Sequence, residues 1–148
     1  MSLLFRRAAR ADLNAIVTLL ADDMLGSGRE RPGDPGYAVA FEAIDADPNQ
    51  LLLVAELDGV VVGCQQITFI PGLTRKGIWR GLIEAVRVRA DLRSRGIGAK
   101  FIEHAVAECR RRGCKLVQLT SHNTRRDAHR FYIRLGFHAS HTGFKLEL

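Results

Sequence analysis

The spacing of apolar residues along the first part of the chain changes from a helical period to a strand period. After a strand-like run at residues 3–7, apolar positions recur every three or four residues, which predicts an amphipathic helix. Its apolar stripe consists of Leu13, Ile16, Val17, Leu20 and Met24. A short helix is predicted at 37–46. Two apolar runs at 51–57 and 60–69 then flank Asp58-Gly59, a dipeptide typical of a two-residue hairpin turn.

The second part of the chain alternates strands with helices. A long strand at 78–89 leads into a predicted helix at 99–112, which is followed by a short strand at 115–120. Because a crossover helix joins these two strands, we expect them to be parallel. Thr124 and Asp127 have the spacing of a capping box, which predicts a last helix that ends at Gly136. Residues 137–140 and 144–148 are predicted to form a closing strand pair.

The predicted order is therefore β-α-α-β-β-β-α-β-α-β-β, an α/β (α+β) fold with a mixed sheet and helices on both faces. We expect one domain covering residues 1–148, because the length is typical of a single domain and neither a repeat nor a linker interrupts the pattern. Residues 26–36 are rich in glycine and proline and predict a loop. This loop either contributes to a binding site or is only a connector.

Composition limits the class of protein. The chain has 47% hydrophobic and 26% charged residues, in the ordinary globular range, and no apolar run approaches the length of a membrane span. No secretion signal is recognised at residues 1–7, so we expect a cytoplasmic protein without a membrane partner. The three cysteines lack metal-ligand spacing and are interpreted as reduced thiols. His122, His138 and His141 are interpreted as surface residues, so no metal site is expected.

The strongest chemical signal is a glycine and arginine corner at residues 93–98, between the strand at 78–89 and the helix at 99–112. Gly96 and Gly98 allow backbone N–H groups to approach a ligand, and the helix that follows presents unpaired N–H groups and its positive dipole end. These properties predict a phosphate-binding site. Taken alone, the two glycines are equally well explained by the conformation of the turn.

The formal net charge of +6 is compatible with a nucleic-acid partner. One basic cluster, at 87–95, brackets the glycine corner, where it would serve a phosphorylated cofactor. The other, at 110–115, lies at a helix C-terminus before Gly113, where cations complement the helix dipole. Because the chain also lacks a recognisable nucleic-acid-binding module, we expect no nucleic-acid partner.

Three motifs in this order resemble the GNAT superfamily of acetyl-coenzyme A-dependent N-acetyltransferases, and the resemblance covers nearly the whole chain. They are Arg93-x-x-Gly96-x-Gly98 at the corner, a strand ending near Asn123, and Ala128-x-x-Phe131-Tyr132-x-x-x-Gly136-Phe137. The resemblance implies an N-acetyltransferase that moves an acetyl group from acetyl-CoA to a primary amine by direct attack in a ternary complex. A non-catalytic acyl-CoA-binding or regulatory module on the same fold is the alternative.

The resemblance also implies which residues hold the cofactor. The pyrophosphate would be bound by Arg93, Ser94, Arg95, Gly96, Ile97, Gly98 and Ala99. The pantetheine arm would pair with the backbone between Val86 and Val88, and one backbone N–H there would polarise the thioester carbonyl. Asn123 would contact the amide groups of the cofactor, Ala128 would lie with the cofactor contacts, and Tyr132 would lie close to the sulfur.

Two residues are candidates for proton transfer. Glu84 is the candidate base, because by period two it points to the same face of its strand as Val86 and Val88. It is otherwise a solvated surface residue, and a bulge would shift its register. Tyr132 is the candidate acid for the leaving thiolate; its alternative role is packing in the core with its hydroxyl satisfied. Cys64 is not expected to act as a nucleophile, because no motif places a histidine beside it.

The acceptor amine is not specified by any motif. A small molecule or a peptide amine is expected, and a homodimer is a further possibility. Gln65 and Gln66 are adjacent on a predicted strand and could bond a polar acceptor, but one of them must point away from it.

Overall fold

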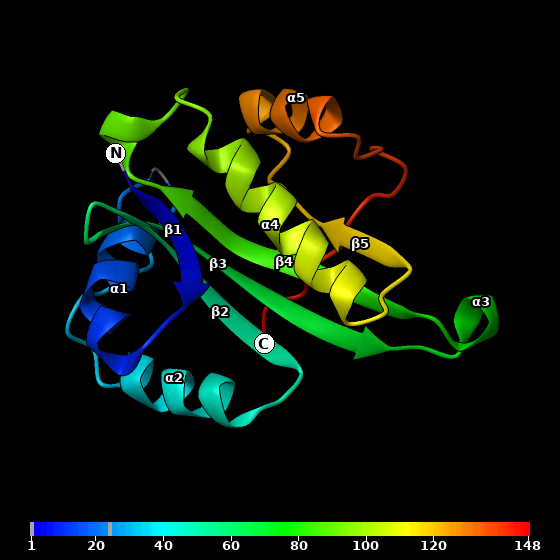
Figure 1. Cartoon of the computed structure of the whole chain (residues 1–148), viewed down its shortest axis with the longest axis horizontal. Helices are drawn as coiled ribbons and strands as arrows, with labels where there is room; N and C mark the ends of the chain where they lie inside the picture. The colour runs from blue at the N-terminus through cyan, green and yellow to red at the C-terminus, as the bar shows by residue number, and fades with distance from the viewer. Residues whose placement is uncertain (1, 24) are drawn as a thin grey trace. The chain divides into compact units, whose positions relative to one another are not determined.

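The computed structural model describes residues 2–23 and 25–148, so Met24, predicted on the first helix stripe, lies outside the described residues. The chain divides into two compact units, residues 1–118 and 119–148, and each is treated by itself below. Figure 1 shows the elements in chain order. They are β1 (Leu3–Arg7), the 3₁₀ turn η1 (Arg10–Asp12), α1 (Leu13–Ala21), α2 (Gly36–Ala46), β2 (Gln50–Leu57), β3 (Val60–Pro71), α3 (Thr74–Gly77), β4 (Trp79–Val88), the 3₁₀ turn η2 (Ala90–Leu92), α4 (Ile97–Arg111), β5 (Leu116–Leu119) and α5 (Arg126–Arg134).

Strands β1 to β5 of the sheet occur in the order along the chain that the sequence predicts for them. Its spatial order is β1-β2-β3-β4-β5, with antiparallel pairing from β1 to β4. Asp58 and Gly59 both adopt positive φ, 50° and 85°, as the tight hairpin turn between β2 and β3 requires. The N–H of Lys115 bonds to the Trp79 carbonyl at 2.9 Å, which joins the beginnings of β4 and β5 as parallel pairing requires. The prediction of a mixed sheet is confirmed.

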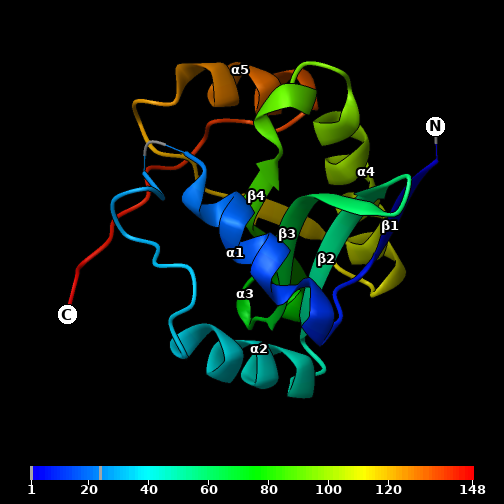
Figure 2. The same ribbon diagram turned by 90° about the vertical axis from the view of Figure 1, so that its left-hand side faces the viewer.

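Helices cover both faces of this sheet, as predicted (Figures 1 and 2). α1 and α2 pack on one face over a core that includes Ile16, Phe41 and Val54. α4 packs on the other face and buries an apolar stripe there, made of Ile97, Phe101, Ile102, Ala105 and Cys109. No helix in the described part of the chain is long and apolar enough to cross a membrane.

The second unit differs from the prediction in two places. Residues 137–148 form no regular strand, so the predicted closing pair at 137–140 and 144–148 is wrong. The predicted capping box is also wrong, because α5 begins at Arg126 after Arg125 and has no side-chain cap. The Thr124 hydroxyl lies 2.8 Å from Nδ1 of His122, a local contact that the capping pattern did not anticipate. Gly136 follows the helix end with φ of 98°, as predicted.

Candidate active site

The corner before α4 has a backbone suited to an anion. Ser94 and Gly96 adopt positive φ, 63° and 83°, while Arg93 between β4 and this pair has φ of −65°. Alternation of this kind turns successive N–H groups toward a common concave side. Gly96 is the N-cap of α4, no described side chain caps that helix, and its first N–H groups have no acceptor within the helix. The corner therefore offers a cluster of backbone donors and a positive dipole end.

The arginines around the corner are not equivalent. Arg89 forms an ion pair with Asp91 at 2.6 Å, which raises the pKa of Arg89 above its ordinary value and lowers the pKa of Asp91. Arg93 uses Nε to bond the Val88 carbonyl at 3.1 Å, so its guanidinium lies at the end of β4. Arg95 is exposed. Arg93 and Arg95 are therefore the two cations of the predicted cofactor set, and the carboxylate of Asp91 already neutralises Arg89.

The outer edge of β4 is only partly covered by its neighbour. β5 has four residues, and its beginning lies beside Trp79 at the beginning of β4. Four residues of a parallel neighbour extend about as far as Ile83. The backbone of β4 from Glu84 to Val88 therefore has no partner from β5, and this edge can accept an extended ligand as an added strand.

A β-bulge interrupts β4 at Ala85 and changes which side chains share a face. Gln66 lies opposite Glu84 and Cys64 lies opposite Arg87, so β4 contains one residue more than β3 over this stretch. Ala85 has φ of 55°, a left-handed conformation that is uncommon for alanine. Strict period two predicted that Glu84 shares a face with Val86 and Val88. That prediction is wrong, because the extra residue places Glu84 on the same face as Arg87.

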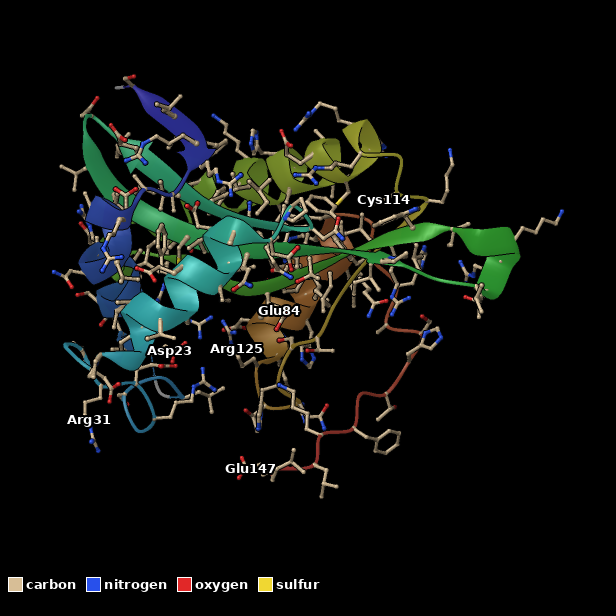
Figure 3. The ribbon with its side chains drawn as sticks, turned by 90° about the horizontal axis from the view of Figure 1, so that it is seen from below. Asp23, Arg31, Glu84, Cys114, Arg125 and Glu147 are labelled. Carbon is tan, nitrogen blue, oxygen red and sulfur yellow. The ribbon has the colours of Figure 1, made fainter. Side chains whose placement is uncertain are left out.

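Glu84 points to the face of the sheet that α1 and α2 cover. Residues directly opposite in an antiparallel pair point the same way, and its partner Gln66 lines a cavity on that face. Figure 3 shows Glu84 on this side of the sheet, where Asp23 at the end of α1 also lies. The Glu84 side chain is exposed, and no ion pair or side-chain hydrogen bond involves it in the described chain. Its carboxylate is therefore available to take a proton.

The two adjacent glutamines of β3 separate as alternation requires. Gln65 is fully buried and donates from Nε2 to the Phe101 carbonyl of α4 at 2.9 Å. Gln66 lies on the opposite face, near Glu84, and donates from Nε2 to Oε1 of Gln50 at 2.8 Å. Of the two, only Gln66 lies on the side of the sheet where an acceptor would meet Glu84.

Cys64 lies beside the bulge, but its thiol is unreactive. Its thiol donates to the Ala85 carbonyl at a distance of 3.6 Å. Burial raises the pKa of Cys64 to about 12, although the charge of Arg87 opposes that shift. Because the thiolate is the nucleophile, a thiol with this pKa is inert near neutral pH. The structure agrees with the interpretation that no acyl-enzyme forms at Cys64.

An ion pair fixes the end of α1 to β4, and sequence reasoning missed it. Arg87 Nε lies 2.9 Å from Oδ2 of Asp23, with side chains 10% and 17% exposed. The same aspartate also accepts the N–H of Gly26 and thus holds the beginning of the 26–36 loop. Residues 64 positions apart carry no joint signal in a single sequence. The unusually basic end of the strand was the only hint.

The predicted residues of the second unit lie around α5. Asn123 is exposed in the segment before this helix, and Ala128 is half-buried on it. Tyr132 is half-buried and contacts Phe131 and Phe137 edge to face, with ring centroids 5.1 Å and 5.8 Å away. The packing role of Tyr132 is therefore real within this unit. Its role as an acid, and the cofactor contacts of Asn123 and Ala128, stay predictions.

Comparison with known proteins identifies the class to which this fold and site belong. The model of the acetyltransferase (GNAT) family matches residues 13–137. The chain is 30% identical over 139 residues to an aminoalkylphosphonate N-acetyltransferase of Salmonella typhimurium (strain LT2), with 94% of this chain and 87% of that protein covered.

Solved structures also match over nearly the whole of this chain, among them the following two. A Bacillus halodurans C-125 protein described as a transcriptional regulator is 43% identical with a TM-score of 0.96, covering 99% of this chain and 100% of that one. An acetyltransferase of Trypanosoma brucei is 26% identical with a TM-score of 0.83, again covering 99% and 100%. The chain belongs to the GNAT acetyltransferase family. The predictions of an N-acetyltransferase, of acetyl-CoA as its cofactor and of an amine as its acceptor are thereby confirmed.

Proposed function

We propose that this enzyme binds acetyl-CoA along the corner and the open edge of β4, and transfers the acetyl group directly to an amine on the α1/α2 side of the sheet. The observation that carries the proposal is the corner backbone, with positive φ at Ser94 and Gly96 directly before an uncapped helix. The pyrophosphate binds there, with Arg93 and Arg95 as cations and Gly98 close to the phosphates.

The pantetheine arm extends from this corner along the β4 backbone between Val86 and Val88. An added strand bonds the backbone groups of an edge that lack a partner strand, and this part of β4 has no β5 partner. The Val86 and Val88 carbonyls accept side-chain donors there, from Arg87 at 2.9 Å and Arg93 at 3.1 Å. One N–H of this segment polarises the thioester carbonyl and stabilises the oxyanion that forms on attack. The bulge at Ala85 supports this role, because a bulge frees backbone groups from regular pairing.

Proton transfer is assigned to Glu84 and Tyr132. An alkylamine has a pKa of roughly 10 and arrives protonated, so a base must accept a proton before the nitrogen attacks the thioester carbon. Glu84 accepts it directly or through water, and its exposed, unpaired carboxylate supports this assignment. Collapse of the tetrahedral intermediate breaks the carbon–sulfur bond, and Tyr132 gives its proton to the leaving thiolate.

The amine acceptor is a small molecule or a peptide, and the small-molecule choice is supported by a relative that is named for an aminoalkylphosphonate acceptor. The proposal treats residues 1–148 as one catalytic domain, which is supported by a family match that spans both units. A cytoplasmic location is supported by the three free cysteines, which suit a reducing compartment. A homodimer stays a prediction.

The Gly98→Val variant tests the cofactor site. A branched side chain in the first turn of α4 obstructs the approach of the pyrophosphate, so the dissociation constant for CoA should rise at least about 10-fold by titration calorimetry. Ala107→Val is the matched control, because residue 107 is exposed on the same helix away from the corner. Unchanged CoA affinity in a folded Gly98→Val protein would show that the cofactor binds elsewhere.

A further inference from the structure

A cavity of about 180 Å³ lies between the sheet and the helices α1 and α2. It reaches the bulge residue Ala85 and the β3 residue Gln66, which lies opposite Glu84. Its other walls are apolar positions of the two helices and of the sheet: Leu13, Ile16, Val17, Leu20, Tyr37, Ala40, Phe41, Ile44, Leu52 and Cys64. The cavity therefore begins where the proposed base lies and extends under the helices.

None of the lining side chains carries a charge at neutral pH. Each of the three polar ones already donates one hydrogen bond: Gln66 to Gln50, the Cys64 thiol to the Ala85 carbonyl, and the Tyr37 hydroxyl to Oε1 of Glu30. The Tyr37 hydroxyl also accepts the Arg31 N–H at 2.8 Å, so it holds the 26–36 loop beside the cavity. The walls that a ligand meets in this cavity are therefore almost entirely carbon.

The charges near the cavity do not suit an anionic ligand. Beside the bulge, the cation that β4 places on this face is Arg87, and the carboxylate of Asp23 neutralises it at 2.9 Å. Arg80 is also on this face, but its guanidinium lies beside Gly72, at the other end of the strand. A phosphonate or carboxylate that entered would lose its water without gaining a cation, which is strongly unfavourable. The lining therefore discriminates against acceptors of the kind named for the Salmonella relative.

The volume indicates how large the apolar group can be. A protein cavity of about 150 Å³ lined by aliphatic and aromatic side chains binds benzene, so a cavity of this size holds one phenyl ring or a chain of about six carbons. Each buried CH₂ group strengthens binding by about fourfold. Small-molecule sites commonly combine an apolar pocket with a few polar groups at one end.

We propose that the acceptor is a primary amine that carries one apolar group about the size of a phenyl ring. The ring occupies the cavity between α1, α2 and the sheet, and the amine lies at its Glu84 end. This proposal rests on the function proposed above, because it uses Glu84 as the point where the amine reacts.

A panel of amines tests the proposed class, with CoA release as the readout. The value of kcat/KM for 2-phenylethylamine should exceed that for 2-aminoethylphosphonate by at least about 10-fold. In the series from propylamine to hexylamine it should rise by about fourfold for each CH₂ group. A preference for the phosphonate, or no dependence on chain length, would overturn the proposal.

Filling the cavity gives a second test. Ala40 lines the cavity but is exposed at its mouth, so Ala40→Phe should lower kcat/KM for 2-phenylethylamine by about 10-fold and leave that for ethylamine nearly unchanged. Ala43→Phe is the matched control, exposed on the same helix but outside the cavity. Equal losses for both amines in Ala40→Phe would contradict the proposed placement.

Binding of the ligands separates this proposal from the function on which it rests. Calorimetry should show 2-phenylethylamine binding to the unmodified chain of residues 1–148, and binding more weakly to Ala40→Phe. If CoA binds but neither 2-phenylethylamine nor hexylamine binds or reacts, the acceptor class is wrong while the cofactor site stands. If 2-phenylethylamine binds in the cavity but CoA release does not depend on Glu84, the acceptor class stands and the assigned base fails.

Discussion

The two faces of the sheet hold their helices in different ways. α4 lies so close to the sheet that a Cβ on Gly81 would be 2.3 Å from Sγ of Cys109, and the buried amide of Gln65 bonds its backbone. α1 instead has an ion pair near each end, Arg6 with Asp12 at 2.8 Å and Arg87 with Asp23 at 2.9 Å. The face under α4 is tightly packed where Gly81 meets Cys109, whereas a cavity lies on the face under α1 and α2.

Because of this difference, some residues of β4 hold the strand in place by packing, and others face the space where the reaction is proposed to occur. Before the bulge, Gly81 and Ile83 of β4 point to the packed face and give the strand a rigid position. Glu84 and Arg87 point to the face with free space, where a substrate can enter. In the function proposed above, the packed face holds the corner at the N-terminus of α4 that binds the cofactor, while the acceptor approaches from the other face.

The largest expected effect comes from removing the proposed base on the face of the sheet that α1 and α2 cover. Glu84→Gln keeps the size of the side chain but removes its basicity, so turnover with an alkylamine should fall by roughly 10²- to 10⁴-fold near pH 7. Glu103→Gln is the control, because Glu103 is an exposed carboxylate on α4. Steady-state kinetics should show near-normal turnover for the control. Equal losses of turnover in both variants would mean that the reaction is not confined to the face that α1 and α2 cover.

A smaller effect is expected from adding volume to the packed face. Gly81→Ala should lower the free energy of unfolding by about 1–3 kcal/mol, because its Cβ collides with the Cys109 thiol. In a Cys109→Ala background the same change should cost little. Gly72→Ala, where a Cβ would have neighbours no closer than 3.5 Å, should be nearly neutral. Urea denaturation would contradict this account if the cost of Gly81→Ala were the same in both backgrounds.

The smallest effect is the loss of stability at acid pH from the Arg6–Asp12 ion pair at the beginning of α1. Hydrogen bonds from Arg6 lower the pKa of Asp12, so the ionised form contributes stability above the usual carboxyl pKa of about 4, and this contribution is lost as the pH falls below it. We expect about 1 kcal/mol for this partly exposed pair. The stability difference between wild type and Asp12→Asn should therefore narrow below pH 4. A stability difference that stays constant from pH 3 to 7 would show that the ionised form of Asp12 does not contribute to stability.

Much of the fold was readable from local signals in the sequence. Asp58-Gly59 encodes its own turn, and the glycines at 96, 113 and 136 mark helix ends where positive φ is needed. The corner and the helix after it were predicted for the same reason. The capping box predicted at the beginning of α5 does not form, because the Thr124 side chain instead contacts His122, two residues away.

The parts of the site that were missed depend on contacts between distant residues. Ala85 has no turn signature, so the alternation of its strand gave no warning of the bulge that turns Glu84 away from Val88. The Arg87–Asp23 ion pair and the cavity likewise arise only when α1 packs on the sheet. Glu84 was predicted from its strand and its chemistry, but its neighbours required the structure.

The pH dependence of the Glu84→Gln deficit tests the central claim most directly, namely that Glu84 takes the proton of the acceptor amine. The ratio of wild-type to Glu84→Gln turnover should be largest near pH 6–7 and should shrink as the pH approaches the amine pKa of roughly 10, because more acceptor then arrives neutral. Parallel pH–rate profiles, offset by a constant factor from pH 6 to 10, would contradict the claim and leave Glu84 as a residue that only positions the amine.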